Sequence, residues 1–370
     1  MRKIKVLQVQ LHKKNDCVLA DEIIRSLPVN FEVTNAFLCG ETCASGYRDG
    51  GIENICFGFP DAWLRGSRLR VLWRLYRFCK QERFDMVVAH RYKPMSLFLQ
   101  LNRWLRFGRV IGIQHGIGDF DRSYRKREMR RLLRENCYVV AVSQAVREYL
   151  LRANLGIDER NCVRIDNAID IAAAERMQLT REYARRQLGL PEGSFLFGTI
   201  GRLVSVKGHI HLLEAFALIK DEFPQANVAI IGEGACRAEL EAASERLGLH
   251  DRVFLLGSRV QALRYVKAFD VFVMPSLSEG LPLALLEGMS GHLPVIGSDI
   301  PALLPILEGC GGGIFPVGQA DGLAECLRDS LEFTEDQLRE QGERCYQYLC
   351  VTHSIEEYRR KYRQLLTASD

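Results

Sequence analysis

The chain has 370 residues and a formal net charge of +4, with 47% apolar and 26% charged residues. This balance is typical of soluble globular proteins, and the length suggests two domains of ordinary size. No run of 18 apolar residues occurs, which argues against a membrane-spanning helix. The 12 cysteines include no CxxC pair, so buried, reduced thiols of a cytosolic protein are expected rather than a zinc or disulfide framework.

Charge is divided unevenly along the chain. Residues 1–170 hold 30 Lys and Arg against 19 Asp and Glu, whereas residues 171–370 hold 20 against 27. The first half, with a net charge of +11, is therefore expected to face an anionic partner. No nucleic-acid-binding motif accompanies this charge, so no nucleic-acid partner is expected.

Short β-branched runs alternate with helix-period segments through the first half of the chain. The basic start at Met1 resembles a signal peptide, but Gln8 and Gln10 interrupt the apolar run, so a first strand is expected instead. The predicted strands are Ile4–Val9, Phe31–Leu38, Met86–Ala89, Val110–Ile113 and Tyr138–Val142. A domain boundary is predicted near Arg164–Asp170, where a short strand ends in an Asx-rich turn.

The second half repeats the alternation after a polar helix predicted over residues 175–188. Its predicted strands are Phe195–Ile200, Val228–Ile231, Val253–Leu255, Val271–Met274, Pro294–Ile296 and Gly313–Phe315. Strand–helix alternation implies parallel sheets with helices on both faces, and the strands are too many for one six-stranded sheet. We predict two doubly wound, Rossmann-like α/β domains: residues 1–170 with a C-terminal helix at about 352–370, and residues 171–351.

Two glutamates eight positions apart follow the strand that ends at Met274. Glu279 lies in a tight Ser-Glu-Gly-Leu-Pro loop, and Glu287 lies about two turns along the next helix. The loop belongs at the C-terminal edge of a parallel sheet, where open α/β folds bind ligands. Carboxylates there suit a ligand rich in hydroxyl groups, because each oxygen accepts charge-assisted hydrogen bonds.

Three glycine turns follow other strands of the same domain. Gly201 and Arg202 end a strand, and Lys207 precedes the next helix, so two cations flank free backbone N–H groups in a manner suited to a diphosphate. The segments Gly232-Glu-Gly234 and Gly257-Ser258 also end strands, although each is weak evidence alone. Together the four loops predict one ligand site.

These motifs resemble the family 4 glycosyltransferases of the retaining, GT-B type, including transferases of lipopolysaccharide and glycolipid synthesis. The matching segments are Gly201-Arg202-Leu203…Lys207-Gly208, Gly232-Glu233-Gly234, Pro275-Ser276…Glu279-Gly280 with Glu287, Pro294-Val295…Ser298-Asp299, and in the first half Asp85…His90, His115-Gly116 and Val142-Ser143. The resemblance implies a GT-B fold, in which two Rossmann-like domains face each other across a cleft. It also implies an acceptor-binding N-terminal domain and a nucleotide-sugar-binding C-terminal domain.

The resemblance assigns roles to individual residues. Arg202 and Lys207 would bind the donor diphosphate and stabilise the departing nucleotide. Glu279 would hold hydroxyls of the donor sugar, and Glu287 would accept from the ribose. Backbone at Gly280 and Leu281 would contact the sugar or β-phosphate, backbone near Ser258 and Arg259 would contact the base, and Gly201, Gly232 and Gly234 would let the chain approach the donor. His115 would face the reacting sugar. No metal or cofactor is implied, and a UDP-sugar is the expected donor.

Two positions depart from the family pattern. The loop at residues 11–16 lacks the glycine pair that many members carry, which puts its usual donor contacts in doubt. The Asn-Gly turn that the family carries between the domains is Asn167-Ala168 here, so the ligand contact of that turn is not expected in this chain.

Asp119-Phe-Asp121 has the DxD spacing of some metal-dependent transferases, but the pattern is common by chance and lies outside the donor domain.

The segment from Arg122 to Arg134 carries seven positive charges and one negative charge. It is either a solvated basic face or a surface helix that contacts anionic lipid or a phosphorylated acceptor. A second basic, aromatic helix is expected around residues 63–77. Both would allow peripheral contact with an anionic membrane.

The predicted activity is metal-independent transfer of a hexose, with retention, from a nucleotide-diphospho-sugar to a membrane-associated anionic glycolipid at the cytoplasmic face of the membrane. Lipopolysaccharide core or another cell-surface polysaccharide is the expected product. The alternatives are a nucleotide-sugar 2-epimerase of the same fold, a phosphorylase, or a non-catalytic nucleotide-sugar-binding subunit. A phosphorylase would need a pyridoxal-binding lysine environment, and none is recognisable in this sequence.

Overall fold

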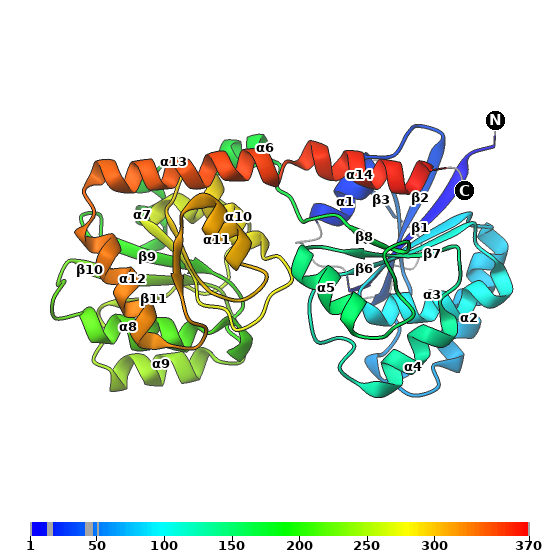
Figure 1. Cartoon of the computed structure of the whole chain (residues 1–370), viewed down its shortest axis with the longest axis horizontal. Helices are drawn as coiled ribbons and strands as arrows, with labels where there is room; N and C mark the ends of the chain where they lie inside the picture. Colours follow the sequence, from blue (N-terminus) through cyan, green and yellow to red (C-terminus); the bar gives the residue numbers. More distant parts are fainter. Residues whose placement is uncertain (1, 13–17, 41–46, 50–51, 369–370) are drawn as a thin grey trace. The chain divides into compact units, whose positions relative to one another are not determined.

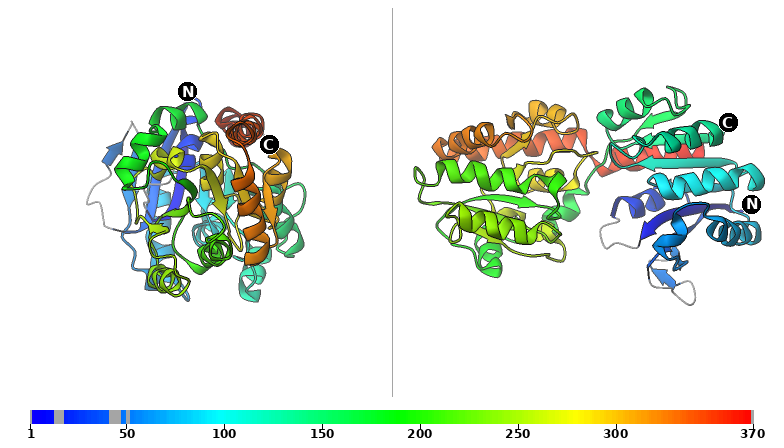
Figure 2. Two further views of the ribbon diagram at one scale, coloured as in Figure 1. Left: turned by 90° about the vertical axis from the view of Figure 1, so that its left-hand side faces the viewer. Right: turned by 90° about the horizontal axis from the view of Figure 1, so that it is seen from below.

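The computed structural model describes residues 2–12, 18–40, 47–49 and 52–368. The chain divides into two compact units, one comprising Met1–Asp166 with Glu356–Asp370 and the other Asn167–Ile355. Each unit is built on its own largely parallel sheet, and Figures 1 and 2 show helices on both sides of the strands. The predicted class, two doubly wound α/β domains, is confirmed.

The first unit contains an eight-stranded sheet in the order β3-β4-β2-β1-β5-β6-β7-β8. All neighbouring strands are parallel except the β3–β4 pair. The strands are β1 Ile4–His12, β2 Phe31–Cys39, β3 Tyr47–Asp49, β4 Ile52–Cys56, β5 Met86–His90, β6 Arg109–Gln114, β7 Cys137–Ala141 and β8 Cys162–Arg164. The helices are α1 Val18–Arg25, η1 Asp61–Leu64, α2 Leu69–Glu82, α3 Tyr92–Leu105, α4 Ser123–Leu132, α5 Gln144–Arg152 and α14 Ile355–Thr367. The sequence prediction omitted β3 and β4.

The last helix, α14, packs beside α1 of the first unit. Tyr358 donates to the carbonyl of Leu19 over 3.1 Å, and Arg359 donates to Glu22 over 2.5 Å. The Glu22 side chain is only 2% exposed, and Arg25 contacts it as well. A buried carboxylate needs such partners, so the Arg359–Glu22 ion pair fixes α14 on α1, while the Arg25–Glu22 pair lies within α1.

The second unit contains a six-stranded, all-parallel sheet in the order β11-β10-β9-β12-β13-β14. The strands are β9 Phe195–Ile200, β10 Ala226–Ile231, β11 Val253–Leu255, β12 Val271–Met274, β13 Val295–Ser298 and β14 Gly313–Phe315. The helices are α6 Ile171–Met177, α7 Arg181–Leu188, η2 Ser205–Lys207, α8 His209–Ile219, α9 Arg237–Arg246, η3 Ala262–Ala268, α10 Leu283–Ser290, α11 Leu304–Cys310, α12 Ala320–Glu332 and α13 Glu335–Thr352. Two apolar layers fill this unit. One includes residues of α8, α9 and α12, and the other residues of α7, α10, α11 and α13.

The single polar helix predicted over residues 175–188 is wrong, because the structure has two helices there. Gln178 is extended after α6, and Thr180 begins α7 by accepting a hydrogen bond from the backbone N–H of Tyr183. A threonine in the N-cap position favours a new helix start over continuation of the old one.

Among the described residues, no helix has both the length and the apolar character needed to cross a bilayer. The described cysteines are free thiols, and seven of them are buried. Burial raises the pKa of the Cys162 thiol to about 11, so it remains protonated at neutral pH.

Candidate functional site

The loops after β9 and β12 meet where the strand order of the second sheet reverses direction. β9 and β12 are neighbours at the centre of the sheet, and the chain leaves them towards opposite edges. Ligands of open α/β sheets bind beside the carboxyl ends of strands at such a switch point. Residues 201–208 follow β9 and residues 275–282 follow β12, so the two strongest sequence motifs flank this position.

An ion pair joins these two loops. The Lys207 Nζ lies 2.5 Å from Glu279 Oε1, and the Ser276 hydroxyl donates to the same carboxylate oxygen over 2.7 Å. The Lys207 and Glu279 side chains are only 17% and 12% exposed. Because Glu279 engages one N–H of an ammonium that has three, Lys207 retains donors for a further anion.

Arg202 lies at the other end of the first loop and is exposed. Within the described part of the chain no residue forms an ion pair with it. Two cations therefore stand on one loop beside the N-terminus of α8, one paired and one available. This combination suits the negative charge of a diphosphate.

The glycines of the site divide into two groups. A Cβ on Gly232 would lie 1.8 Å from the Gly201 carbonyl oxygen, and one on Gly234 would lie 2.2 Å from that of Leu203. A Cβ on Gly201 would have its nearest neighbour, a His209 ring nitrogen, at an ordinary 3.6 Å. Loop packing thus accounts for Gly232 and Gly234, whereas the protein alone leaves room for a side chain at Gly201.

This contrast predicts different outcomes for two alanine substitutions. Gly232→Ala should destabilise the second unit by about 1–3 kcal/mol, because backbone must move to admit the methyl group. Gly201→Ala should change stability by less than about 0.5 kcal/mol, yet weaken nucleotide binding at least about tenfold, or ~1.4 kcal/mol. Urea unfolding and UDP titration of both variants measure the two effects. Unchanged UDP affinity in Gly201→Ala would remove this glycine from the site.

The remaining predicted donor contacts occupy three places in the second unit. Gly280 and Leu281 are buried in the loop after β12, and Glu287 is half-buried on α10. Ser258 and Arg259 are exposed just beyond β11. All of them follow C-terminal strand ends, and their ligand roles stay predictions.

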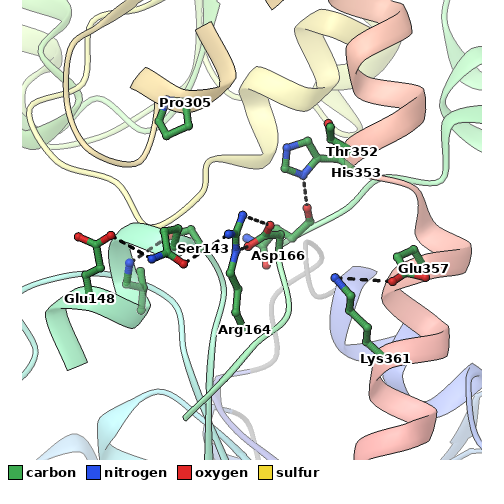
Figure 3. A network of polar contacts seen from close by, with 12 residues as sticks. Ser143, Glu148, Arg164, Asp166, Pro305, Thr352, His353, Glu357 and Lys361 are labelled. Atoms are coloured by element: carbon green, nitrogen blue, oxygen red, sulfur yellow. Dashed lines mark hydrogen bonds and ion pairs between the residues drawn. The ribbon is translucent and has the colours of Figure 1, made fainter. Parts of the chain in front are cut away.

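Asn167 is a positioning residue whose role sequence reasoning left open. Its buried side-chain amide donates to the Leu281 carbonyl over 2.9 Å, while its own carbonyl lies 2.9 Å from His353 Nδ1. Figure 3 labels His353 and draws this contact as a dashed line. The first residue of the second unit therefore holds the loop that carries Glu279. In the sequence, the Asx-rich turn within Arg164–Asp170 was the feature that pointed to Asn167.

His115 lies in the first unit, against a second histidine that the sequence prediction did not select. His90 Nδ1 and His115 Nε2 are 3.1 Å apart, and the rings are stacked. Burial lowers the pKa of His90 to about 3 and that of His115 well below its usual value, so both rings are neutral at pH 7. His90 is the last residue of β5, which pairs with β6. This position at a strand end was the feature of the sequence that could have identified His90 as a candidate.

The paired aspartates of the DxD pattern have structural partners. Asp119 accepts from the Gln114 side chain over 2.8 Å, and Asp121 accepts from the Tyr149 hydroxyl over 2.9 Å.

Among the described residues, the side chains of His12, Cys39 and Asp61 bring possible metal ligands within 4.8 Å of one another. The pKa of Cys39 is raised to about 11 by burial and by Asp61, which favours the protonated thiol over a thiolate ligand. The prediction that no metal takes part remains untested.

The described part of loop 11–16 is limited to Leu11 and His12, which end β1. Residues 13–16 lie outside the described residues, so the effect of the missing glycines stays a prediction.

His209, the first residue of α8, predicts a pH dependence of stability. Burial, and then the charge of Lys207, lower its pKa to about 4, against about 6.5 when unfolded. The unfolded chain therefore binds more protons between these values, and the stability present above pH 6.5 is lost on acidification towards pH 4, by up to about 3 kcal/mol. Unfolding of wild type and His209→Gln at pH 7.5 and 5 should show a smaller loss in the variant. The exposed His250→Gln is the control, and an equal loss in all three proteins would contradict the assignment.

Two family models and several known proteins match the sequence of this chain. The family model described as Glycosyl transferases group 1 matches residues 180–367, and the model described as Glycosyltransferase Family 4 matches residues 31–173. The UDP-Gal:alpha-D-GlcNAc-diphosphoundecaprenol alpha-1,3-galactosyltransferase of Escherichia coli is 30% identical over 63% of this chain and 62% of its own length. The amylovoran biosynthesis glycosyltransferase AmsK of Erwinia amylovora is 27% identical over 60% of this chain and 54% of its own length. The chain thus covers less than two thirds of these relatives.

Solved structures support the fold over the whole chain. A glycosyltransferase from Rickettsia africae superposes with a TM-score of 0.81 at 17% identity, covering 100% of both chains. Anabaena HepE, solved in complex with UDP, has a TM-score of 0.80 at 19% identity and 99% coverage of both chains. The GT-B fold predicted from the sequence is confirmed.

Proposed function

Because the chain belongs to the group 1 glycosyltransferases, we propose that it transfers a hexose from a nucleotide-diphospho-sugar to a lipid-linked acceptor. The Lys207–Glu279 pair at the switch point of the second sheet carries the donor half of this proposal. The Lys207 ammonium can bind phosphate and the Glu279 carboxylate can bind sugar hydroxyls, and both groups lie where the loops after β9 and β12 meet. UDP is the expected nucleotide, and the UDP complex of HepE is compatible with it.

In the proposed reaction, the bond between the sugar C1 and the β-phosphate oxygen breaks while C1 bonds to the acceptor oxygen on the same face. The departing phosphate oxygen takes the acceptor hydroxyl proton, so nucleoside diphosphate is released and the configuration is retained. Arg202 and Lys207 stabilise the negative charge that grows on the diphosphate. Glu279 and Glu287 hold donor hydroxyls, and neutral His115 contacts the sugar. No step requires a metal.

The acceptor half of the proposal draws on the charge of the first unit and on the relatives. The E. coli relative is named for a diphosphoundecaprenol acceptor, and the Erwinia relative for amylovoran biosynthesis. A lipid-linked, anionic acceptor would also match the net charge of +11 over residues 1–170. We propose that the enzyme acts at the inner face of the cytoplasmic membrane, in synthesis of lipopolysaccharide core or another cell-surface polysaccharide.

A donor screen followed by a transfer assay tests the function. UDP-, GDP-, ADP- and dTDP-sugars are compared by thermal shift, because preferential binding to the folded state raises its stability. The preferred donor is then incubated with sugar-diphospho-lipid acceptors, and the anomer of the product is determined. We expect a UDP-sugar to give the largest shift and an α-donor to give an α-product. Donor isomerisation without acceptor would instead indicate an epimerase, and binding without turnover a non-catalytic subunit.

A further inference from the structure

A cationic pocket lies in the first unit, apart from the donor loops in the sequence. It has a volume of about 710 Å³, within the range of about 300–1,000 Å³ common for small-molecule sites. Its lining includes five cations and one carboxylate, namely Arg65, Arg68, Lys93, Arg122, Arg125 and Glu128. Like charges gathered around one hollow repel one another, so an anionic ligand would relieve an unfavourable arrangement.

The single lining carboxylate is already neutralised. Arg68 lies 2.5 Å from Glu128, and the Tyr92 hydroxyl donates to the same carboxylate. Arg125 is held by Asp119, both through its backbone carbonyl at 2.6 Å and through an ion pair at 3.6 Å. Arg68 and Arg125 therefore build the wall of the pocket.

Three other cations remain for a ligand. Arg65, Lys93 and Arg122 form no ion pair with any residue that the structure describes. The pKa of Tyr124, another lining residue, is lowered by hydrogen bonds, first from Arg125 of the pocket wall and then from Arg122.

Three helices begin at this pocket, which adds to its positive potential. Arg68 and Arg122 are the N-cap residues of α2 and α4, and Tyr92 is the first residue of α3. In the described structure none of the three starts has a side-chain cap, so backbone N–H groups of their first turns remain for an acceptor. Helix dipoles of this orientation favour a negative charge.

Exposed apolar side chains lie in the first turns of α2, the helix whose N-cap residue Arg68 lines the pocket. Leu69 follows Arg68 at the start of α2 and is 69% exposed, and Trp73, one turn further along the same helix, is 59% exposed. Tyr124, in the pocket lining, is also exposed. An anion carrying a hydrocarbon chain matches this surface better than a free inorganic ion does.

We propose that this pocket binds the diphosphate of the lipid-linked acceptor, with Arg65, Lys93 and Arg122 as its ligands and α2 beside the lipid chain. The inference rests on the proposed function, which supplies the acceptor class. Several charge-assisted contacts converge on one group that every such acceptor shares, whatever its sugar. The pocket would therefore recognise an acceptor by its lipid-linked diphosphate and not by its sugar.

The test measures binding of inorganic pyrophosphate and of a short-chain prenyl diphosphate by calorimetry, with the donor site saturated by UDP. The variant combines Arg65→Gln, Lys93→Gln and Arg122→Gln, which leaves the ion pairs of the pocket wall intact. The matched control combines Arg103→Gln, Arg152→Gln and Arg160→Gln, three exposed positions of the same unit. We expect wild type and control to bind both probes and the pocket variant to bind them at least tenfold more weakly, with unchanged UDP affinity.

Several outcomes would overturn the proposal. Equal affinity in all three proteins, or no probe binding by wild type in the presence of UDP, excludes a diphosphate site. Weakened sedimentation of the pocket variant with phosphatidylglycerol vesicles, without any change in probe affinity, assigns the cations to membrane headgroups instead. These results are independent of the transfer assay, so the pocket can fail while the proposed function stands, and the reverse.

Discussion

Replacing Lys207 with alanine is expected to reduce sugar transfer by roughly thirtyfold to several thousandfold, the equivalent of ~2–5 kcal/mol. The substitution removes the paired cation beside the expected position of the donor diphosphate and leaves Glu279 without its partner. Turnover of the preferred nucleotide-sugar, measured at saturating acceptor, gives the effect. Lys267→Ala, at another partly exposed lysine of the second unit, is the control and should retain activity.

A double variant separates catalysis from structure at this pair. If Lys207 and Glu279 only hold their loops together, removing both should restore what each single alanine substitution loses. We expect Lys207→Ala/Glu279→Ala to regain stability relative to Lys207→Ala and to remain inactive. Near-normal turnover in the double variant would show that the ion pair is structural and that the donor binds elsewhere.

Replacing Arg185 with alanine is expected to destabilise the second unit by about 3–5 kcal/mol, since it removes one partner of a buried ion pair. The side chain is 0% exposed and lies 2.8 Å from Asp270. It also donates to the carbonyls of Ala268, Glu192 and Ser194, each over 2.8 Å, so alanine would leave several buried acceptors unsatisfied.

The same carboxylate supplies a matched control for this prediction. Arg181 also contacts Asp270, at 2.6 Å, but its side chain is 45% exposed, so Arg181→Ala should cost less than about 1 kcal/mol. Urea unfolding followed by circular dichroism measures both effects. The three tryptophans, Trp63, Trp73 and Trp104, all lie in the first unit, and their fluorescence transition should move little in either variant. Equal destabilisation by the two substitutions would contradict the role of Arg185.

The donor loops show how the sequence and the structure contribute to one site. Periodicity located β9 and β12, and the composition of the following loops selected Arg202, Lys207 and Glu279 as candidates. Residues after parallel strands reach the same sheet edge, so their proximity was predictable from local pattern. The direct Lys207–Glu279 contact was not, because it depends on which strands are neighbours across 72 positions of sequence.

The glycines illustrate a second limit. Gly201, Gly232 and Gly234 look alike in the sequence, since each follows a strand. Only the packed loops show that Gly232 and Gly234 make room for protein backbone while Gly201 does not face that constraint. Asn167 was uncertain for the same reason, because its partner at Leu281 comes from a distant loop.

The sequence by itself determined the two parallel α/β units, the family and the residues that follow the strands of the second sheet. Those features depend on local periodicity and on short motifs, which a linear pattern records directly. The tertiary structure decided which charges are paired and which stay available. Arg68 and Arg125 are engaged while Arg65, Lys93 and Arg122 face an open pocket, and this division arises because three helix starts from separate parts of the chain meet at one place.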